Sequence, residues 1–370
     1  SLKLLSDFDL NNSFYPFIEN VKNITLPTGA FVLHFIFYLI FNELSFIILE
    51  FIFIIIFIII FYKISRLLDL SRIKSLTIAI ILFNLPILFQ LFGIDHIDYI
   101  RSLHSTFYSL RFPRPMVSNI FFFIFILFIL KFSKRKLLNK KNSLILGCIS
   151  GLTFTSVFHF FVLEQLFIIF TLLYLFKFYK IKKLRENVNN IFLYIISFLI
   201  ISSPTLVNMF FSEIDFLERL GFTILDFRQK IFLLKYLFFK LFETQFLVTF
   251  LITTLLFLVI NFNKNFYTIK ILNPFFILFY LSIISPFIFI FISPTYFSMG
   301  HLFNNIILVT CFLLYFFLTC LILNTLLKRT LYFKFKNYFS FLILLICLCA
   351  NIYQTNVNYN KNQLKKENIT

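Results

Sequence analysis

Residues 46–62 read FIILEFIFIIIFIIIFY and hold one charged side chain, Glu50. The run is continuous rather than alternating, so it predicts a helix and not a strand. A helix needs about 20 mainly apolar residues to cross the hydrocarbon of a bilayer. Only helices and closed barrels satisfy their backbone groups there. Similar runs recur along the chain, so the sequence predicts an all-α fold: a polytopic integral membrane bundle of helices.

The composition of the 370 residues agrees with this fold class. Hydrophobic residues make up 60% of the chain and charged residues 14%, whereas soluble domains are closer to half apolar and a quarter charged. The net charge of +18 would suit nucleic acid, but the basic residues lie in short linkers between apolar runs, which favours membrane orientation and no nucleic acid partner. All five cysteines lie inside apolar runs without zinc or disulfide spacing, so we interpret them as small buried side chains.

Clusters of Lys and Arg occur at every second gap between the apolar runs and predict the orientation of each crossing. They hold 21 of the 34 basic residues and only two of the 16 acidic ones, and they are the linkers 63–74, 131–141, 177–186, 264–270 and 328–336. Basic linkers stay in the cytoplasm. The remaining connections, with most of the carboxylates, are therefore predicted to lie outside, and the protein is expected in the cytoplasmic (inner) membrane as a multi-pass chain.

About ten spans follow from this alternation. They are 46–62, 75–93, 116–130, two short spans within 143–176, 190–211, 246–261, 271–292, 306–327 and 339–352. A tight outer turn near His159 and Glu164 is predicted to join the two short spans, and longer outer loops cover 94–114 and 212–243. We expect one transmembrane domain over residues 1–353 and a polar, disordered tail over 354–370.

Residues 1–45 predict an outer loop that contains an interfacial helix. Segment 29–41 is short for a crossing, and the parity of the later spans excludes it as one if residues 1–28 lie outside. The alternative places 1–28 in the cytoplasm and makes 29–41 a true crossing. Because the chain begins at Ser1 and residues 1–28 have the pattern of a loop, we also expect a first transmembrane helix to be missing upstream.

The first two predicted outer segments carry paired carboxylates. Asp7 and Asp9 stand two residues apart and can share a divalent cation such as Mg²⁺ or Mn²⁺, or supply a base. Asp95 and Asp98 can lie on one helix face, with Arg101 a further turn along. Carboxylates beside Arg suit recognition of a phosphate and a metal. Solvated acidic loops with local ion pairs are the alternative for both segments.

Further basic residues in the predicted outer segments are candidates for binding phosphate. Arg111 and Arg114 flank Pro113, Arg219 lies in the 212–243 loop, and His301 precedes a span at its outer end. The same residues can instead anchor the chain at lipid headgroups. Residues 230–243 mix lysines with Leu, Phe and Tyr, which predicts a helix in the membrane interface with snorkelling lysines.

Two features inside the spans also stand out. Ionisable groups at membrane depth are functional hypotheses, but at the predicted turn His159 and Glu164 would be in contact with water. Gly147 and Gly151 are spaced for close packing against another helix.

The order of these features resembles the polytopic GT-C glycosyltransferases. The resemblance rests on the early Asp7–x–Asp9 motif, the acidic loop with Asp95 and Asp98, the Arg-Phe-Pro-Arg-Pro stretch at 111–115, the outward-ending Phe-His-Phe at 158–160 and the late outer His301. It implies an enzyme that transfers a sugar, a hexose or a pentose, from a polyprenyl-phosphate carrier to an acceptor at the outer face of the membrane, in the cell envelope.

The resemblance also implies roles for particular residues. Asp7 or Asp9 would act as base or metal ligand, and Asp95 and Asp98 would assist. Arg101, Arg111, Arg114, Arg219 and His301 would hold the lipid phosphate. Two rival functions remain open. A lipid or polysaccharide transporter or flippase would have polar groups along a path through the bilayer, and a non-catalytic membrane subunit would have its carboxylates scattered.

Overall fold

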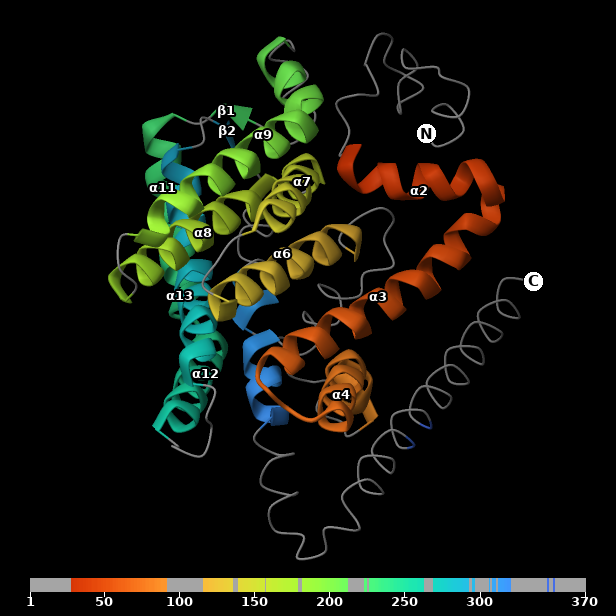
Figure 1. The fold of residues 1–370 in the computed structure, drawn as a ribbon. Helices are drawn as coiled ribbons and strands as arrows, with labels where there is room; N and C mark the ends of the chain where they lie inside the picture. The colour runs from red at the N-terminus through yellow and green to blue at the C-terminus, as the bar shows by residue number, and fades with distance from the viewer. Residues whose placement is uncertain are drawn as a thin grey trace, which may run out of the picture.

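A computed structural model shows a helical protein whose helices pack at varied angles (Figure 1). The structure describes residues 28–91, 116–135, 139–156, 158–178, 182–211, 223–224, 226–262, 269–292, 295–296, 306, 308–310, 312–320, 345 and 349. Its helices are α2 (Thr28–Phe41), the short η2 (Asn42–Leu44), α3 (Ser45–Leu67), α4 (Arg72–Leu91), α6 (Met116–Arg135), α7 (Lys140–Ser156), α8 (Phe158–Phe178), α9 (Lys182–Phe211), α11 (Phe227–Leu241), α12 (Thr244–Phe262) and α13 (Ile269–Ile292).

The apolar runs coincide with these helices. Six helices contain or closely match single predicted spans: α3, α4, α6, α9, α12 and α13. α7 and α8 are helices at the positions where two short spans are predicted within 143–176. The described residues between 306 and 320 are helical as well. α9 begins inside the basic linker predicted at 177–186, because Lys, Arg and Glu are good helix formers and continue the helix beyond its apolar part.

Four of the described helices are long and apolar enough to cross a membrane. These stretches are Ile47–Leu67, Val117–Lys134, Val188–Val207 and Pro274–Phe291. A fifth crossing results if Phe227–Leu241 and Phe246–Val259, which meet at a bend of 64°, form one broken span. The protein is therefore a helical membrane protein, and the count of ten spans is not confirmed by the part of the chain that the structure describes.

Large apolar side chains cover the outside of the bundle. Phe51 of α3 is 65% exposed, Phe192 of α9 is 62% exposed and Leu255 of α12 is 59% exposed. A soluble protein rarely exposes apolar surface on this scale. In hydrocarbon the same surface is solvated by lipid, and the helices satisfy their own backbone groups.

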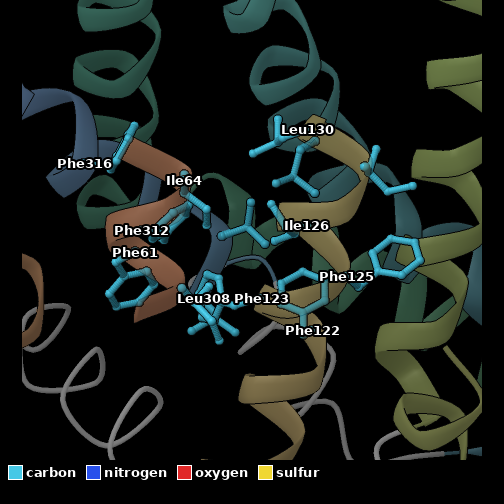
Figure 2. Close-up of a cluster of buried hydrophobic side chains, with 14 of the residues drawn as sticks. Phe61, Ile64, Phe122, Phe123, Phe125, Ile126, Leu130, Leu308, Phe312 and Phe316 are labelled. Atoms are coloured by element: carbon cyan, nitrogen blue, oxygen red, sulfur yellow. The ribbon is translucent and has the colours of Figure 1, made fainter. Parts of the chain in front are cut away.

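Aromatic side chains fill the interior where α3, α6 and residues 308–320 meet (Figure 2). The ring centroids of Phe61 and Phe123 are 5.3 Å apart, and Phe312 stands 5.6 Å from Phe61 and 4.9 Å from Phe123. On the other side of α6, Phe122 stacks on Phe160 of α8 at 4.6 Å. We call Phe57, Phe61, Phe123 and Phe312 the aromatic core; each is at most 2% exposed.

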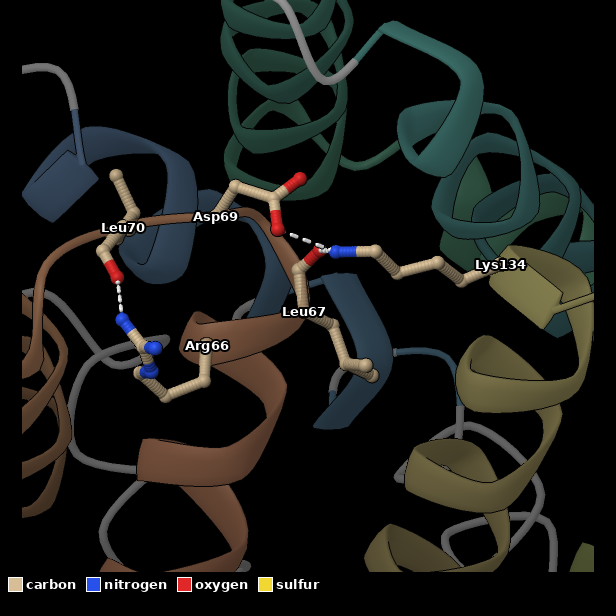
Figure 3. Close-up of polar contacts among 5 residues, drawn as sticks. All are labelled: Arg66, Leu67, Asp69, Leu70 and Lys134. Carbon is tan, nitrogen blue, oxygen red and sulfur yellow. Dashed lines mark hydrogen bonds and ion pairs between the residues drawn. The ribbon is translucent and has the colours of Figure 1, made fainter.

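Two basic linkers meet at one end of the bundle. Lys134, in the last turn of α6, donates from Nζ to the Leu67 carbonyl at 3.0 Å and forms an ion pair with Asp69 (Figure 3). Asp69 turns the chain between α3 and α4 with a φ of 57°, a left-handed conformation that Asp adopts more readily than most residues. The predicted linkers 63–74 and 131–141 thus lie together, as the alternation of crossings requires.

The directions of the next helices follow from their contacts. α8 runs antiparallel to α7, since Ser150 meets Glu164 while Phe154 meets Phe161. α9 runs parallel to α7, because Gly147 lies against Tyr194 and Ser197 while Gly151 lies against Phe198 and Ile201. α7 begins at Lys140, six residues after Lys134, so it starts near the Asp69–Lys134 contact and runs away from it. α9 runs in the same direction, so both helices end far from that contact.

The same far end holds the start of α2 and the two short strands. Gly29 at the start of α2 packs against Leu152, Thr155 and Ser156 near the end of α7. Strand β1 (Thr223–Ile224), in the segment after α9, pairs antiparallel with β2 (Thr295–Tyr296), which follows α13. In Figure 1, α2 and the β1–β2 pair lie toward the top, and the turn from α3 to α4 lies at the bottom.

Candidate functional site

The most extensive helix contact in the described structure is that between α7 and α9, and small residues allow the two helices to approach closely. A Cβ added at Gly147 would lie 2.0 Å from Ser197 Oγ and 2.3 Å from the Tyr194 carbonyl oxygen. A Cβ at Gly151 would lie 2.8 Å from the side chain of Ile201. The close packing predicted from the spacing of the two glycines is confirmed, and it brings Tyr194 over the middle of α7.

A group of polar side chains, most of them hydrogen-bonded to one another, fills the space that α7, α8 and α9 share. We call it the polar cluster, and its members are Ser150 and Thr153 from α7, Glu164 and Gln165 from α8, and Tyr194 from α9. Ser150, Thr153 and Glu164 are fully buried, and Tyr194 is 6% exposed.

Hydrogen bonds in the polar cluster converge on the Glu164 carboxyl group. Gln165 Nε2 donates to the Tyr194 hydroxyl at 2.7 Å, and that hydroxyl donates to Ser150 Oγ at 3.0 Å. Ser150 Oγ in turn donates to Glu164 Oε2 at 2.8 Å. Hydrogen bonds in such a chain polarise one another and strengthen the last bond.

The second oxygen of the same carboxyl group is left open. Glu164 Oε1 is buried and accepts no hydrogen bond from the described residues. The Thr153 hydroxyl lies beside the carboxyl group but donates to the Ile149 carbonyl at 3.0 Å. A buried polar atom without a partner is costly, so it usually signals an unseen ligand or a functional role.

The position of Glu164 corrects the sequence analysis. α7 ends at Ser156 and α8 begins at Phe158, so Glu164 lies six residues into α8, about 9 Å from its first residue. The prediction of a wet turn position for Glu164 was therefore wrong. The run of 34 residues has no glycine or proline near the turn that would have marked it, so the helix boundary could not be read from the sequence.

All the residues predicted for catalysis and phosphate binding lie outside the described residues. They are Asp7, Asp9, Asp95, Asp98, Arg101, Arg111, Arg114, Arg219 and His301. The proposed metal pair, Asp7 and Asp9, is among them. Within the described part of the chain, no group of three or more His, Cys, Asp or Glu side chains is placed to hold a metal ion.

The pairing of β1 with β2 links the segments that contain two of the predicted residues, Arg219 and His301. Arg219 shortly precedes β1 in the chain and His301 shortly follows β2, and the two strands are paired through Thr223–Tyr296 and Ile224–Thr295. Two segments predicted as separate outer connections thus meet through their backbones.

Comparison of the chain with protein-family models, with curated proteins and with solved structures gave no match. The candidate site therefore rests on its own geometry.

Proposed function

We propose that this protein is a membrane-embedded glycosyltransferase. It transfers a sugar from a polyprenyl-phosphate donor to an acceptor at the outer face of the cytoplasmic membrane. In this proposal the chain crosses the membrane about ten times, and α2 and α11 lie in the outer interface. Asp7, Asp9, Asp95 and Asp98 supply the base and any Mg²⁺ or Mn²⁺ site.

The observation that supports this proposal best is the separation of the two ends of the bundle. The Asp69–Lys134 contact brings two basic linkers together at one end. At the other end, the β1–β2 pair joins the segment after α9, which contains acidic residues, to the segment after α13, which contains His301 (Figure 1). A basic end belongs to the cytoplasm. The proposed phosphate ligands Arg219 and His301 then flank strands on the side where a lipid-linked sugar would be used.

The chemistry requires such a gathering of charged groups. Sugar transfer builds positive charge at the anomeric carbon and negative charge on the departing phosphate. A carboxylate takes the proton of the acceptor hydroxyl, and Arg or a cation stabilises the phosphate. The hydrocarbon tail of a polyprenyl donor lies in the bilayer, so an enzyme embedded there meets its substrate directly.

A turnover assay tests the proposal. Purified protein in liposomes is given polyprenyl-phosphate sugars, and the loss of sugar from the donor to an added hydroxyl acceptor or to water is compared for the wild type, Asp7→Asn and Asp95→Asn. We expect turnover to fall by about 100-fold or more in both variants, since a general base contributes on the order of 10²–10⁴-fold. Asp69→Asn is the matched control, because Asp69 lies at the opposite end. Unchanged turnover in both test variants removes this site assignment.

A second function, transport or flipping of a lipid or polysaccharide, draws support from the polar cluster. Its buried carboxyl group lies within the helices, where a transport path needs polar groups. In liposomes, a transporter would move a fluorescent lipid-linked sugar between leaflets without releasing the sugar. A protein with neither activity would be a non-catalytic membrane subunit.

A further inference from the structure

Among the side chains that the structure describes, no charged group pairs with Glu164 to balance an ionised carboxylate. It is the one charged residue in the middle of α2, α6, α7, α8, α9 and α13, the helices at or around the polar cluster, and α2 adds the ionisable His34 and Tyr38. A carboxylate that is fully buried without a counter-charge is strongly disfavoured. One positive charge delivered to the site removes that cost.

The ionisable residues around Glu164 are few or distant from it along their helices. Tyr194 of α9 belongs to the polar cluster, and α7 and α13 contribute Cys148 and Tyr280. The other ionisable residues of these helices lie near helix ends: Lys131, Lys134, Arg135, Lys140, Lys141, His159, Tyr174, Lys177, Lys182, Lys183, Arg185, Glu186 and Lys270.

The ligand set of the polar cluster is made of oxygen. It offers the open Glu164 Oε1, the hydroxyls of Ser150 and Tyr194, and the amide oxygen of Gln165. Oxygen ligands suit hard cations. The single carboxylate neutralises one unit of positive charge, so a monovalent ion leaves the site neutral, whereas a divalent ion would leave an excess charge inside the bundle.

We propose that the polar cluster is an intramembrane binding site for one monovalent cation, Na⁺ or a proton, with Glu164 Oε1 as its charged ligand. The site belongs to the α7–α8–α9 unit and does not depend on sugar transfer. Since the three helices each contribute to it, the bound ion ties them together. Removing the ion leaves repulsion between Oε1 and the neighbouring oxygen lone pairs.

The direct test is the thermal unfolding midpoint of the full chain in detergent, at constant ionic strength. An Na⁺ site predicts a midpoint that rises by about 2 °C for each tenfold increase in Na⁺ above its dissociation constant, with K⁺ or choline as replacement. A proton site predicts no response to Na⁺ and a midpoint that falls as the pH is raised. Glu164→Gln removes the charge while keeping the shape, and both responses should disappear.

Glu243→Gln is the matched control for this substitution. Glu243 is exposed and pairs with Lys240, so removing its charge should leave the response of the wild type in place. If Glu164→Gln responds to Na⁺ and pH as the wild type does, or if the wild type responds to neither, the proposal is overturned.

A chemical test on the wild type covers the case in which Glu164→Gln does not fold. Dicyclohexylcarbodiimide is apolar and adds to protonated carboxyl groups to give a stable N-acylurea, which mass spectrometry locates on the peptide that contains Glu164. Protection by Na⁺ identifies an Na⁺ site, and loss of labelling at high pH without an Na⁺ effect identifies a proton site. The proposal is overturned if labelling of Glu164 changes with neither the Na⁺ concentration nor the pH, or if Glu164 is not labelled under any condition.

Discussion

The α3–α6 interface and the α7–α9 interface hold helices together by opposite means. The first fills the space between helices with phenylalanine rings at centroid distances of 5.3 Å for Phe61 and Phe123 and 6.2 Å for Phe57 and Phe123. The second leaves no room for side chains at Gly147 and Gly151 and joins the backbones directly. In lipid, apolar burial gives little net driving force between helices, so packing and hydrogen bonds decide. The aromatic interface is therefore sensitive to removal of atoms, and the glycine interface to addition of them.

The largest effect is expected from emptying the aromatic core. Phe123→Ala removes a ring that contacts Phe57, Phe61 and Phe312 and leaves a cavity between three segments. The free energy of unfolding should fall by about 3 kcal/mol, measured by denaturation of the protein in mixed micelles. Phe170→Ala on the lipid-facing side of α8, where the side chain is 45% exposed, should cost far less. Equal losses in the two variants would contradict the distinction between core and lipid-facing rings.

Adding one methyl group should break the other interface. Gly147→Ala places a Cβ on Ser197 Oγ and the Tyr194 carbonyl oxygen, and the carbonyl belongs to the backbone and has little freedom to move. A loss of about 2 kcal/mol is expected, although alanine favours a helix by about 1 kcal/mol over glycine. Gly147→Ala combined with Ser197→Gly should recover part of the loss. A more stable Gly147→Ala protein would show that α7 and α9 are not in contact at this point.

Hydrogen bonds of the polar cluster should contribute less. Tyr194→Phe removes the hydroxyl that links Gln165 to Ser150. We expect a loss of about 1 kcal/mol, since interhelical hydrogen bonds in membranes are commonly worth 0.6–2 kcal/mol. Tyr236→Phe, at an exposed position of α11, is the control. No change on removal of the Tyr194 hydroxyl would mean that the direct hydrogen bond from Gln165 Nε2 to Ser150 Oγ, 3.1 Å long, is enough to hold Ser150 against Glu164.

The smallest effect is expected at the polar end of the α3–α6 interface. Lys134→Met removes the ion pair with Asp69, whose side chain is 65% exposed. Exposed ion pairs contribute about 0–1 kcal/mol and are screened by salt. The difference from wild type should shrink between low and high salt in the same denaturation assay. A loss that does not depend on salt would indicate that the hydrogen bond to the Leu67 carbonyl matters more than the charge.

The sequence predicted helices well, because apolar runs of near-spanning length leave few other structures possible in a membrane. It also predicted that the basic linkers 63–74 and 131–141 lie on one side, which agrees with their contact, and it predicted the close approach at Gly147 and Gly151. It missed the polar cluster. Ser150, Gln165 and Tyr194 lie on three helices, and single polar residues in apolar runs show nothing of their partners until the helices are packed. The roles assigned to particular residues in sugar transfer stay a prediction, because those residues lie outside the part of the chain that the structure describes.

The composition of α7 has a consequence for how the protein enters the membrane. Its sequence contains serines, threonines, an asparagine and two glycines, and its central residues are buried by neighbouring helices rather than by lipid. Such a helix partitions weakly into lipid by itself. During synthesis α7 emerges before α9, the helix against which its glycines pack. Its stable insertion must therefore await the chain as far as Ile201, 45 residues beyond Ser156. The translocon would then have to accept the three helices as one cooperative unit, which makes α7 the segment whose insertion responds most to changes elsewhere in the chain.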